Sequence, residues 1–472
     1  MKYDYHIIVI GGGSGGLLIA AASSSLGAKV ALIESNKMGG ECLNYGCVPS
    51  KSLLRSAHIN SYVNNANRYG LNAGNNTADI NSVLNRVNKV VDGISPHDSK
   101  ERFEEMGVDV YLSKGEFIDA NRIAIGDKSI TGKNIVIATG SSPTIPPIEG
   151  LDKVNYYTNE TIFNIEYLPK HLIVLGAGPI GTELSQAFNN LGSKVTMVNR
   201  SDALFRKDEP EVKPIMKDIF ISEGVEFQMN IKIKSVKEDD EGITLLIEKD
   251  GKDIKVKGDA LLVALGRKPN TKELGLKKAG VELSDKGHVL TDSYLRTNIK
   301  NIYAVGDVTG LYAFTHMAGY QGSIVVQNII FPVKKKVDYS NVPWVTYTKP
   351  EVAHVGHTEK HLTDNKMEYK VYMESLSEND RALAEENTEG FLKIITDKRG
   401  IVIGATMISE KAGEQIGLAN MAINKKIKIT EFMQITFPYP TELEIYKTLA
   451  VNARKESIKS WQMKLIKKMF LR

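Results

Sequence analysis

Two stretches of the chain repeat one pattern of apolar and polar positions. In each, a short apolar run enters a glycine-rich turn, a helical stretch follows, and a second apolar run ends the unit. The first copy runs from His6 to Glu34 and the second from His171 to Asn199. In both copies the second run ends 23 positions after the first glycine of the turn. Strand, glycine turn, helix and strand in this order are typical of a dinucleotide-binding fold. The sequence therefore predicts two such folds and two bound dinucleotides.

The turn glycines have distinct expected roles. They are Gly11, Gly13 and Gly16 in the first copy, and Gly176, Gly178 and Gly181 in the second. The first glycine of such a turn permits the tight bend, the second lets the backbone approach a pyrophosphate, and the third lets helix and strand pack closely. The pyrophosphate then meets the positive end of the helix dipole. A purely structural turn is the alternative, and the repetition in register favours the nucleotide.

The residue at the end of each second strand predicts that the two sites bind different nucleotides. Glu34 can accept hydrogen bonds from a ribose 2′-hydroxyl, which suits FAD or NAD. The second copy has Asn199 there, followed by Arg200 and then Arg206. Two arginines with no carboxylate beside them suit the 2′-phosphate on the adenosine ribose of NADPH. We therefore expect NADPH as the electron donor, with NADH as the alternative. Both arginines could instead be solvated surface residues.

The rest of the chain predicts a mixed architecture. Short alternating runs from about Val108 to Gly140, and again from Phe220 to Gly266, predict strand meanders. After about Asp338 strands and helical stretches mix without a nucleotide motif, which predicts a separate α+β domain. The expected fold class is α/β, with two Rossmann-type domains and a C-terminal α+β domain.

Composition and charge limit the classes of protein to which the chain can belong. The 472 residues are 42% apolar and 25% charged, as in ordinary globular proteins. The formal charge is +4, but residues 452–472 carry seven Lys or Arg and one Glu, a sum of +6. The body is thus near neutral, so we expect no nucleic-acid binding. No apolar run is long enough to span a bilayer, and no signal-peptide pattern precedes the first strand, so we expect a cytoplasmic protein.

Cys42 and Cys47 are the two cysteines of the sequence. Two thiols five positions apart in a reducing compartment favour transient redox or metal chemistry over a structural disulfide. A structural zinc site needs four ligands, and no histidines with matching spacing complete one, so we expect no metal.

The segment GGECLNYGCVPSK, residues 39–51, resembles the redox-active segment of the class I pyridine nucleotide–disulfide oxidoreductases. That family includes glutathione reductase, dihydrolipoamide dehydrogenase and mercuric reductase, and the resemblance extends from about Tyr5 to Ala450. It implies FAD, with Cys47 nearest the flavin and Cys42 facing the substrate. It also implies that Lys51 lies beside the flavin and pairs with Glu183. A nearby lysine and a helix N-terminus would both lower a thiol pKa.

Further positions match the family's cofactor-contacting segments. They are Gly40, Gly115, Thr139 and Gly140 in the N-terminal part, and Gly266, Gly306, Asp307 and His316 later in the chain. By resemblance, Asp307 would bond the ribitol chain and His316 would approach the isoalloxazine. Asp307 could equally cap a helix.

The resemblance divides the chain into four parts. Residues 1–149 and 266–338 would form the FAD-binding domain, and residues 150–265 the NAD(P)H-binding domain. Residues 339–450 would form the dimerisation domain of a homodimer, and residues 451–472 a basic amphipathic tail.

The C-terminal catalytic segment departs from the common family pattern. The family usually has a histidine, oriented by a glutamate five positions later, that serves as acid and base across the dimer interface. Here Tyr439 takes the histidine position and Glu444 the glutamate position. Tyrosine titrates near 10 and histidine near 6.5, so Tyr439 is a weak base at neutral pH. Loss of a positioned base typically costs about 10²–10⁴-fold. A packed interface aromatic is the alternative role of Tyr439.

The acceptor follows from this departure. Mercuric reductases resemble the chain in having tyrosine at that place, but this sequence has no cysteine after Cys47 to hand an ion inward. We therefore expect an enzyme that reduces a metal ion, a quinone or an oxidant. A reductase of small disulfides, such as dihydrolipoamide dehydrogenase, is one alternative. A flavin-loaded sensor or structural subunit with little turnover is another.

The tail after Asn452 has its own pattern. Apolar residues recur at spacings of 3, 4 and 4, at Ile458, Trp461, Leu465 and Met469, and Ile466 and Phe470 widen the same helical face. The cations lie largely elsewhere. This pattern is typical of an interfacial helix on anionic lipid, so residues 454–472 are expected to contact the inner face of the membrane. A terminal helix packed on the dimer is the alternative.

Overall fold

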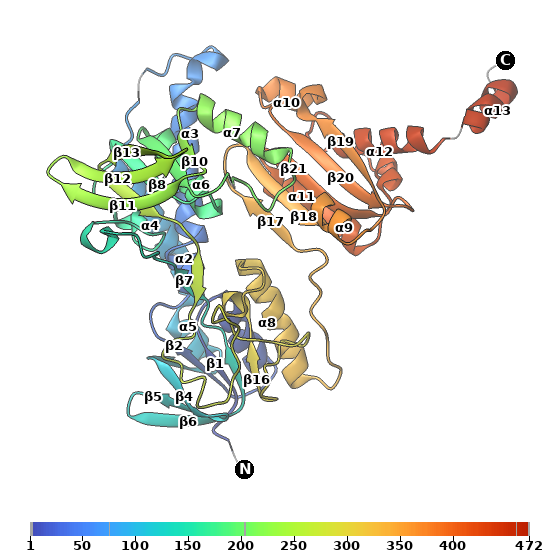
Figure 1. The fold of residues 1–472 in the computed structure, drawn as a ribbon. Coiled ribbons are helices and arrows are strands. Elements are labelled where there is room, and N and C mark those ends of the chain that lie inside the picture. The colour runs from blue at the N-terminus through green and yellow to red at the C-terminus, as the bar shows by residue number, and fades with distance from the viewer. Residues whose placement is uncertain (1–2, 75, 203, 459, 471–472) are drawn as a thin grey trace. The chain divides into compact units, whose positions relative to one another are not determined.

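The computed structural model describes residues 3–74, 76–202, 204–458 and 460–470 (Figure 1). The chain divides into two compact units. The first comprises Met1–Asp202 and Val225–Val337, and the second Ala203–Gly224 and Asp338–Arg472. No helix in the described part of the chain combines the length and apolarity needed to cross a bilayer.

The first sheet of the first unit has the strand order β3-β2-β1-β6-β5-β4, and β16 also pairs with β6. Strands β3, β2, β1, β6 and β16 are parallel, whereas β4 and β5 are antiparallel. The bounds are β1 (Tyr5–Ile10), β2 (Val30–Glu34), β3 (Val108–Leu112), β4 (Gly115–Asp119), β5 (Arg122–Ile125), β6 (Lys128–Ile137) and β16 (Ile302–Ala304).

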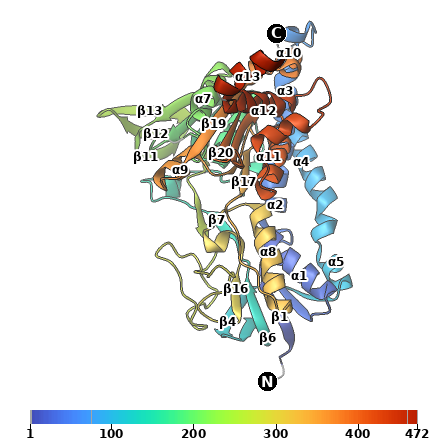
Figure 2. The same ribbon diagram turned by 90° about the vertical axis from the view of Figure 1, so that its right-hand side faces the viewer.

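Both faces of this sheet are covered. Ile7 and Val9 of β1 pack with residues of α1 (Ser14–Ser25) and α8 (Thr315–Ile330), which lie side by side (Figure 2). Ile8 and Ile10 point the other way, into a cluster with apolar residues from the 274–308 segment. A parallel sheet buried on both faces requires unbroken apolar strands, which explains the run that opens the sequence.

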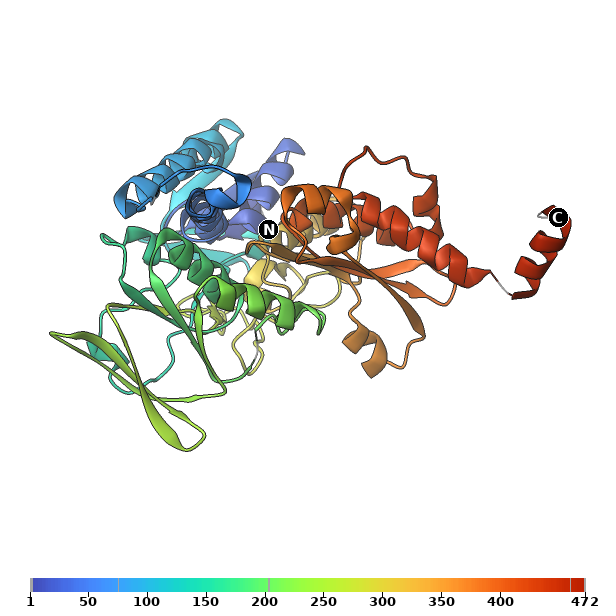
Figure 3. The same cartoon turned by 90° about the horizontal axis from the view of Figure 1, so that it is seen from above.

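The second nucleotide-type sheet is parallel, in the order β10-β9-β8-β14. An antiparallel ribbon, β11-β12-β13, lies between β10 and β14 in the chain (yellow-green in Figure 3), and β7 pairs with β15. The strands are β7 (Ser141–Pro143), β8 (His171–Leu175), β9 (Lys194–Asn199), β10 (Glu226–Met229), β11 (Lys232–Asp239), β12 (Gly242–Lys249), β13 (Lys252–Gly258), β14 (Ala260–Val263) and β15 (Arg267–Pro269). The other helices of the first unit are α2 (Gly40–Asn44), α3 (Cys47–Asn64), α4 (Ile80–Ile94), α5 (Lys100–Glu105) and α6 (Pro179–Leu191).

The second unit is built on an antiparallel sheet in the order β17-β18-β21-β20-β19. Its strands are β17 (Pro343–Thr346), β18 (Glu351–Gly356), β19 (Tyr369–Ser375), β20 (Phe391–Asp397) and β21 (Val402–Ser409). Helices α11 (Ala412–Asn424) and α12 (Glu444–Ser457) pack their apolar residues on one face of the sheet. The remaining helices are α7 (Val212–Ser222), α9 (Glu359–Asp364), α10 (Asp380–Glu385) and α13 (Ser460–Phe470). The predicted α/β class, with two Rossmann-type parts and a C-terminal α+β part, is confirmed. The predicted domain boundaries stay a prediction.

A buried ion cluster ties the 203–224 segment into the second unit. The fully buried ammonium of Lys393, on β20, lies 2.9 Å from Glu209 and 2.7 Å from Glu211, and it also contacts Glu359. Burial alone would lower the pKa of Lys393, but the three carboxylates outweigh it and the net direction is upward. Among the described residues these three carboxylates are the one acidic group close enough to hold a cation, and the lysine supplies that charge.

Lys393→Ala should therefore destabilise the protein by about 3–5 kcal/mol, because it leaves the buried Glu209 carboxylate without its counter-charge. Urea unfolding followed by fluorescence measures this change. Lys398→Ala is the matched control, since the Lys398–Glu368 pair is 3.9 Å apart with both side chains exposed. That control should cost less than about 1 kcal/mol. Equal effects of the two variants would contradict the buried-charge account.

Candidate active site

The two cysteines lie at the ends of a short connection between helices. Cys42 lies within α2, and Cys47 is the first residue of the 18-residue helix α3. The left-handed backbone at Gly39 and Gly40, with φ of 86° and 59°, turns the chain out of β2 toward these helices. The position of Cys47 exposes its sulfur to the unpaired amide groups and positive dipole of a long helix, which favours a thiolate.

The two thiols have different acidities. Both are free in the structure, and Cys47 Sγ lies 3.4 Å from the Thr315 hydroxyl at the start of α8. A hydrogen bond from Cys42 is the main cause that lowers the pKa of Cys47 to about 6, and Thr315 and the Lys51 charge add to it. The same hydrogen bond, followed by burial, raises the pKa of Cys42. At neutral pH the pair therefore holds a Cys47 thiolate beside a Cys42 thiol.

The cation beside the thiols is held by a buried acid. Lys51 lies one turn after Cys47 on α3, and its Nζ is 2.8 Å from Glu183 Oε2 on α6. The Lys51 side chain is 36% exposed and that of Glu183 only 6%. The buried carboxylate thus fixes the lysine where its charge acts on Cys47.

The first glycine turn has the shape that a bound pyrophosphate requires. A Cβ on Gly11, whose φ is 113°, would lie 2.3 Å from Ala138 O, and one on Gly16 would lie 1.9 Å from Gly11 O. At Gly13 the nearest atom would be 3.9 Å away. Two glycines are therefore required by the fold itself. The middle one faces open space that a side chain would fill, so the turn fits a phosphate group approaching the backbone.

The second turn repeats this geometry. A Cβ would lie 2.3 Å from Ala264 O at Gly176 and 2.4 Å from Gly176 O at Gly181. At Gly178 nothing lies within 4 Å. Both turns thus share the division between two fold-required glycines and one open glycine, and both leave the same space beside the backbone.

The residues that follow the two turns differ as expected. Buried Glu34 accepts from Gly12 N and Asn36 N, each at 2.6 Å, and carboxylate oxygens can accept further bonds. At the second site the Asn199 amide donates to Ser201 O at 2.7 Å. Arg200 is exposed in the first unit. Arg206 is exposed in the second unit, so the structure does not bring the two arginines into one compact unit.

A polar network that the sequence interpretation missed anchors the dithiol segment. The Arg267 guanidinium donates two hydrogen bonds to the Glu41 carboxylate, one to each oxygen. Its Nε donates to Ser141 Oγ at 2.8 Å. Ser141 in turn donates to Asp307 Oδ2 at 2.5 Å. Burial raises the pKa of Glu41, and Arg267 opposes that shift. Glu41 directly precedes Cys42, and Arg267 directly follows Gly266. The opposite charges of these two residues, each inside a recognised motif, were the sequence feature from which their pairing could have been predicted.

The other residues predicted to contact a cofactor differ in their hydrogen bonds and in the space around them. Thr139 Oγ1 donates to Asn270 O at 2.7 Å, and Gly306 N donates to Gln321 at 2.6 Å. A Cβ would meet nothing within 4 Å at Gly140 or Gly266, whereas at Gly40 it would lie 2.7 Å from Gly13 and at Gly115 3.2 Å from Ile33. His316 is exposed and stacks on Phe314 with ring centroids 5.3 Å apart.

Tyr439 has a partner that sequence spacing did not predict. Its hydroxyl donates to Asp380 Oδ2 at 3.0 Å, and its side chain is 72% exposed. The hydrogen bond to Asp380 raises the pKa of Tyr439. Glu444 instead accepts from Thr441 N at 3.5 Å. The hydrogen bond to Asp380 thus favours the protonated phenol. Tyr439 belongs to the second unit and the thiols to the first.

Two dinucleotide-binding turns and a dithiol with one activated sulfur define a nucleotide-dependent dithiol oxidoreductase. Residues 5–322 match the family described as pyridine nucleotide-disulphide oxidoreductase, and residues 342–450 match its dimerisation domain. The chain belongs to this family. It is an FAD-dependent enzyme with NAD(P)H as electron donor, and the dimerisation domain supports the predicted homodimer.

Relatives with established names fall into several groups. The chain is 35% identical over 454 residues to a mercuric reductase of Staphylococcus aureus, covering 96% of this chain and 83% of the relative. It is 33% identical over 436 residues to a dihydrolipoyl dehydrogenase of Bacillus subtilis, covering 89% and 90%. Among solved structures, the HOCl-induced flavoprotein disulfide reductase RclA of Escherichia coli matches with a TM-score of 0.85 at 27% identity, covering 95% and 99%. A Cu(II) complex of RclA matches with the same TM-score at 26% identity, covering 96% and 100%.

The surroundings of Cys47 predict a ranking of the effects of single substitutions on its pKa. In the reduced protein, iodoacetamide should alkylate Cys47 with a midpoint near pH 6, which is read by mass spectrometry across a pH series. Cys42→Ala should raise this midpoint most, because it removes the main hydrogen bond to the thiolate. Lys51→Met should raise it less, and the exposed control Lys128→Met should leave it unchanged. A midpoint that stays near 6 in Cys42→Ala would contradict the assignment.

The geometry of the second glycine turn predicts that alanine at Gly178 impairs nucleotide binding, whereas alanine at Gly181 impairs stability. Gly178→Ala should leave the melting temperature unchanged, because its Cβ has room, and should raise the KM for the nicotinamide nucleotide at least about tenfold. Gly181→Ala should instead lower the melting temperature, because its Cβ would lie 2.4 Å from a carbonyl oxygen. A Gly178→Ala variant with unchanged nucleotide KM would favour the purely structural turn.

Proposed function

We propose that this enzyme passes electrons from NADPH through FAD and the Cys42–Cys47 pair to a metal ion, a quinone or an oxidant. The hydrogen bond from Tyr439 to Asp380 is the observation that carries this choice of acceptor. It raises the pKa of a phenol that is already a weak base near neutral pH. Exchange with a substrate disulfide needs a group that takes and returns protons, whereas reduction of a metal ion does not.

The residues have the following proposed roles. The first glycine turn and Glu34 would hold the pyrophosphate and adenosine ribose of FAD, and Asp307 and His316 would contact the rest of the cofactor. The bound flavin supplies the hydride and electron-transfer chemistry. Lys51, fixed by Glu183, keeps the Cys47 sulfur ionised. Cys42 faces the acceptor, and the loss of two electrons, to one two-electron acceptor or to two Cu(II) ions, leaves a Cys42–Cys47 disulfide. The Cys42 thiol proton is released to solvent or, with a quinone or oxidant, to the reduced acceptor.

The preference for NADPH rests on charge at the second nucleotide site. Asn199 places no carboxylate where a ribose 2′-phosphate would bind, and exposed Arg200 directly follows it. A guanidinium can hold a phosphate through two parallel hydrogen bonds. Arg206 is proposed to add a second positive charge. NADH remains the competing donor.

Two relatives support a metal ion among the acceptor classes. The Staphylococcus aureus relative is named a mercuric reductase, and the Escherichia coli RclA structure was also determined as a Cu(II) complex. Both are proteins similar to this one, which makes soft or redox-active metal ions the first acceptors to examine.

An acceptor screen with the purified holoenzyme and NADPH tests the proposal. We expect turnover with Cu(II), Hg(II), a quinone or hypochlorite, abolished in Cys42→Ser, and little turnover with lipoamide or glutathione disulfide. Tyr439→His should raise disulfide turnover about 10²-fold or more, because histidine titrates near neutral pH.

Turnover of the wild type with lipoamide or glutathione disulfide alone would contradict the proposal and identify a small-disulfide reductase. No turnover with any acceptor, together with slow flavin reduction by NADPH and NADH, would favour a flavin-loaded sensor.

We also propose that the enzyme works in the cytoplasm, in part at the inner face of the membrane. The basic segment from residue 454 to residue 472 supports this location. Of this segment, Lys459, Leu471 and Arg472 lie outside the described residues, as do the side chains of residues 464–466.

A further inference from the structure

The C-terminal helix α13 carries large apolar side chains that its own chain does not cover. Trp461 is 58% exposed, Met463 42%, Met469 60% and Phe470 73%. Four such residues within 11 positions form a concentration of apolar surface that monomeric proteins seldom leave in water. The exposure indicates that α13 has a partner beyond the described residues of this chain.

The charges on α13 are arranged to one side of this apolar surface. At about 100° per residue, Lys467 and Lys468 fall within one sector of the helix. Trp461, Met463, Met469 and Phe470 spread across the remaining circumference. Both lysines are exposed, and the helix contains no Asp or Glu. A partner of α13 must therefore be apolar inside and negatively charged at its surface.

We infer that α13 is a membrane-surface helix that binds anionic phospholipid. Trp461 and Phe470 would enter the boundary between headgroups and acyl chains, while Lys467 and Lys468 would contact anionic headgroups. A bilayer with anionic lipid meets both requirements at once, because its apolar interior lies directly beneath a negatively charged surface. The inference specifies the lipid partner of the proposed membrane location, and it holds whichever acceptor the enzyme reduces.

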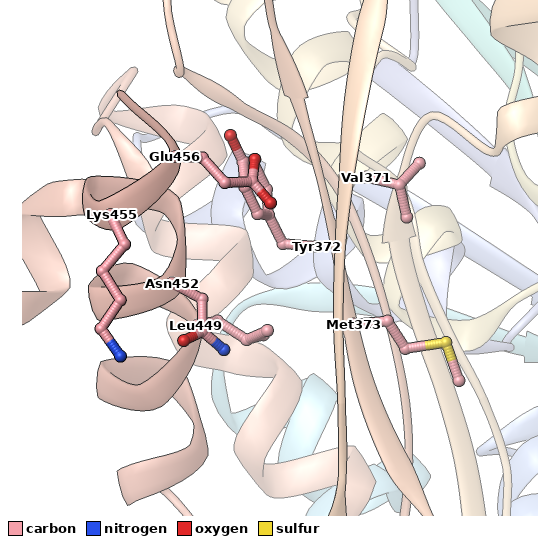
Figure 4. Close-up of a pocket in the computed structure, with 7 residues that line it drawn as sticks. All are labelled: Val371, Tyr372, Met373, Leu449, Asn452, Lys455 and Glu456. Atoms are coloured by element: carbon pink, nitrogen blue, oxygen red, sulfur yellow. The ribbon is translucent and has the colours of Figure 1, made fainter. Parts of the chain in front are cut away.

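The pocket between β19 and α12 is the competing place for the apolar residues of α13, from the same or a second copy of the chain. Its volume is about 440 Å³, and Val371, Tyr372, Met373, Leu449, Asn452, Lys455 and Glu456 line it (Figure 4). One lysine and one glutamate make its lining close to neutral, so it offers no net attraction to the lysines of α13. Charge complementarity thus favours lipid.

Sedimentation of the full-length holoenzyme with vesicles tests the inference. We expect binding to vesicles of phosphatidylcholine with phosphatidylglycerol at least about tenfold stronger than to phosphatidylcholine alone, and weakened by high salt. The double variants Trp461→Ser/Phe470→Ser and Lys467→Glu/Lys468→Glu should each lose about tenfold or more in binding. The matched controls Leu26→Ser/Val333→Ser and Lys128→Glu/Lys133→Glu change exposed residues elsewhere and should bind as the wild type does.

Quenching of tryptophan fluorescence by brominated acyl chains distinguishes lipid insertion from protein docking. Quenching of the wild type that disappears in Trp461→Phe is the expected result. Absence of binding to anionic vesicles would overturn the inference, and so would binding that the apolar and lysine variants leave intact. A shift of the monomer–dimer equilibrium in Trp461→Ser/Phe470→Ser without loss of vesicle binding would assign α13 to protein contact. NADPH turnover with a soluble acceptor should be unchanged in all of these variants, so failure of the acceptor screen stays a separate result.

Discussion

The hydrogen bond between the Cys42 thiol and the Cys47 sulfur sets the chemistry of the site. It lowers the pKa of Cys47 and raises that of Cys42, so one proton is shared unequally between two sulfurs. Three other features act in the same direction at Cys47: the start of α3, the Thr315 hydroxyl and the charge of Lys51. Lys51 acts there because Glu183, buried on α6, holds its ammonium group. The packing of α3 against α6 thus fixes the electrostatics of the dithiol.

The two glycine turns show how one fold can bind two nucleotides for different purposes. Their steric demands are nearly identical, with the first and third glycine blocked by carbonyl oxygens and the middle one open. The difference lies at the end of the following strand, where Glu34 stands in one copy and Asn199 in the other. In the proposed assignment the repeated backbone binds phosphate, and these single side chains distinguish the two nucleotides.

The periodic features could be predicted from the sequence, whereas the pairings between distant residues could not. Apolar runs entering glycine turns predicted both nucleotide folds, because β1 and β8 must be apolar on both faces. Thr315 was not predicted as a neighbour of Cys47, since 268 positions separate them. Glu41 and Arg267 lie 226 positions apart, and Asp380 lies 59 positions before Tyr439. Spacing carries no information about such contacts. For the same reason the buried Lys393 cluster, which brings residues 209–211 to β20, had no signal in the sequence.

The central claim is that a Cys47 thiolate beside the flavin receives electrons that entered from the nicotinamide nucleotide. An anaerobic titration of the holoenzyme with NADPH, followed by absorbance, tests it most directly. The account predicts that the enzyme takes up two pairs of electrons. The first pair should produce a long-wavelength band that fades as pH falls through about 6 and is absent in Cys47→Ser. Bleaching of the flavin by the first electron pair, with no such band at any pH, would contradict it.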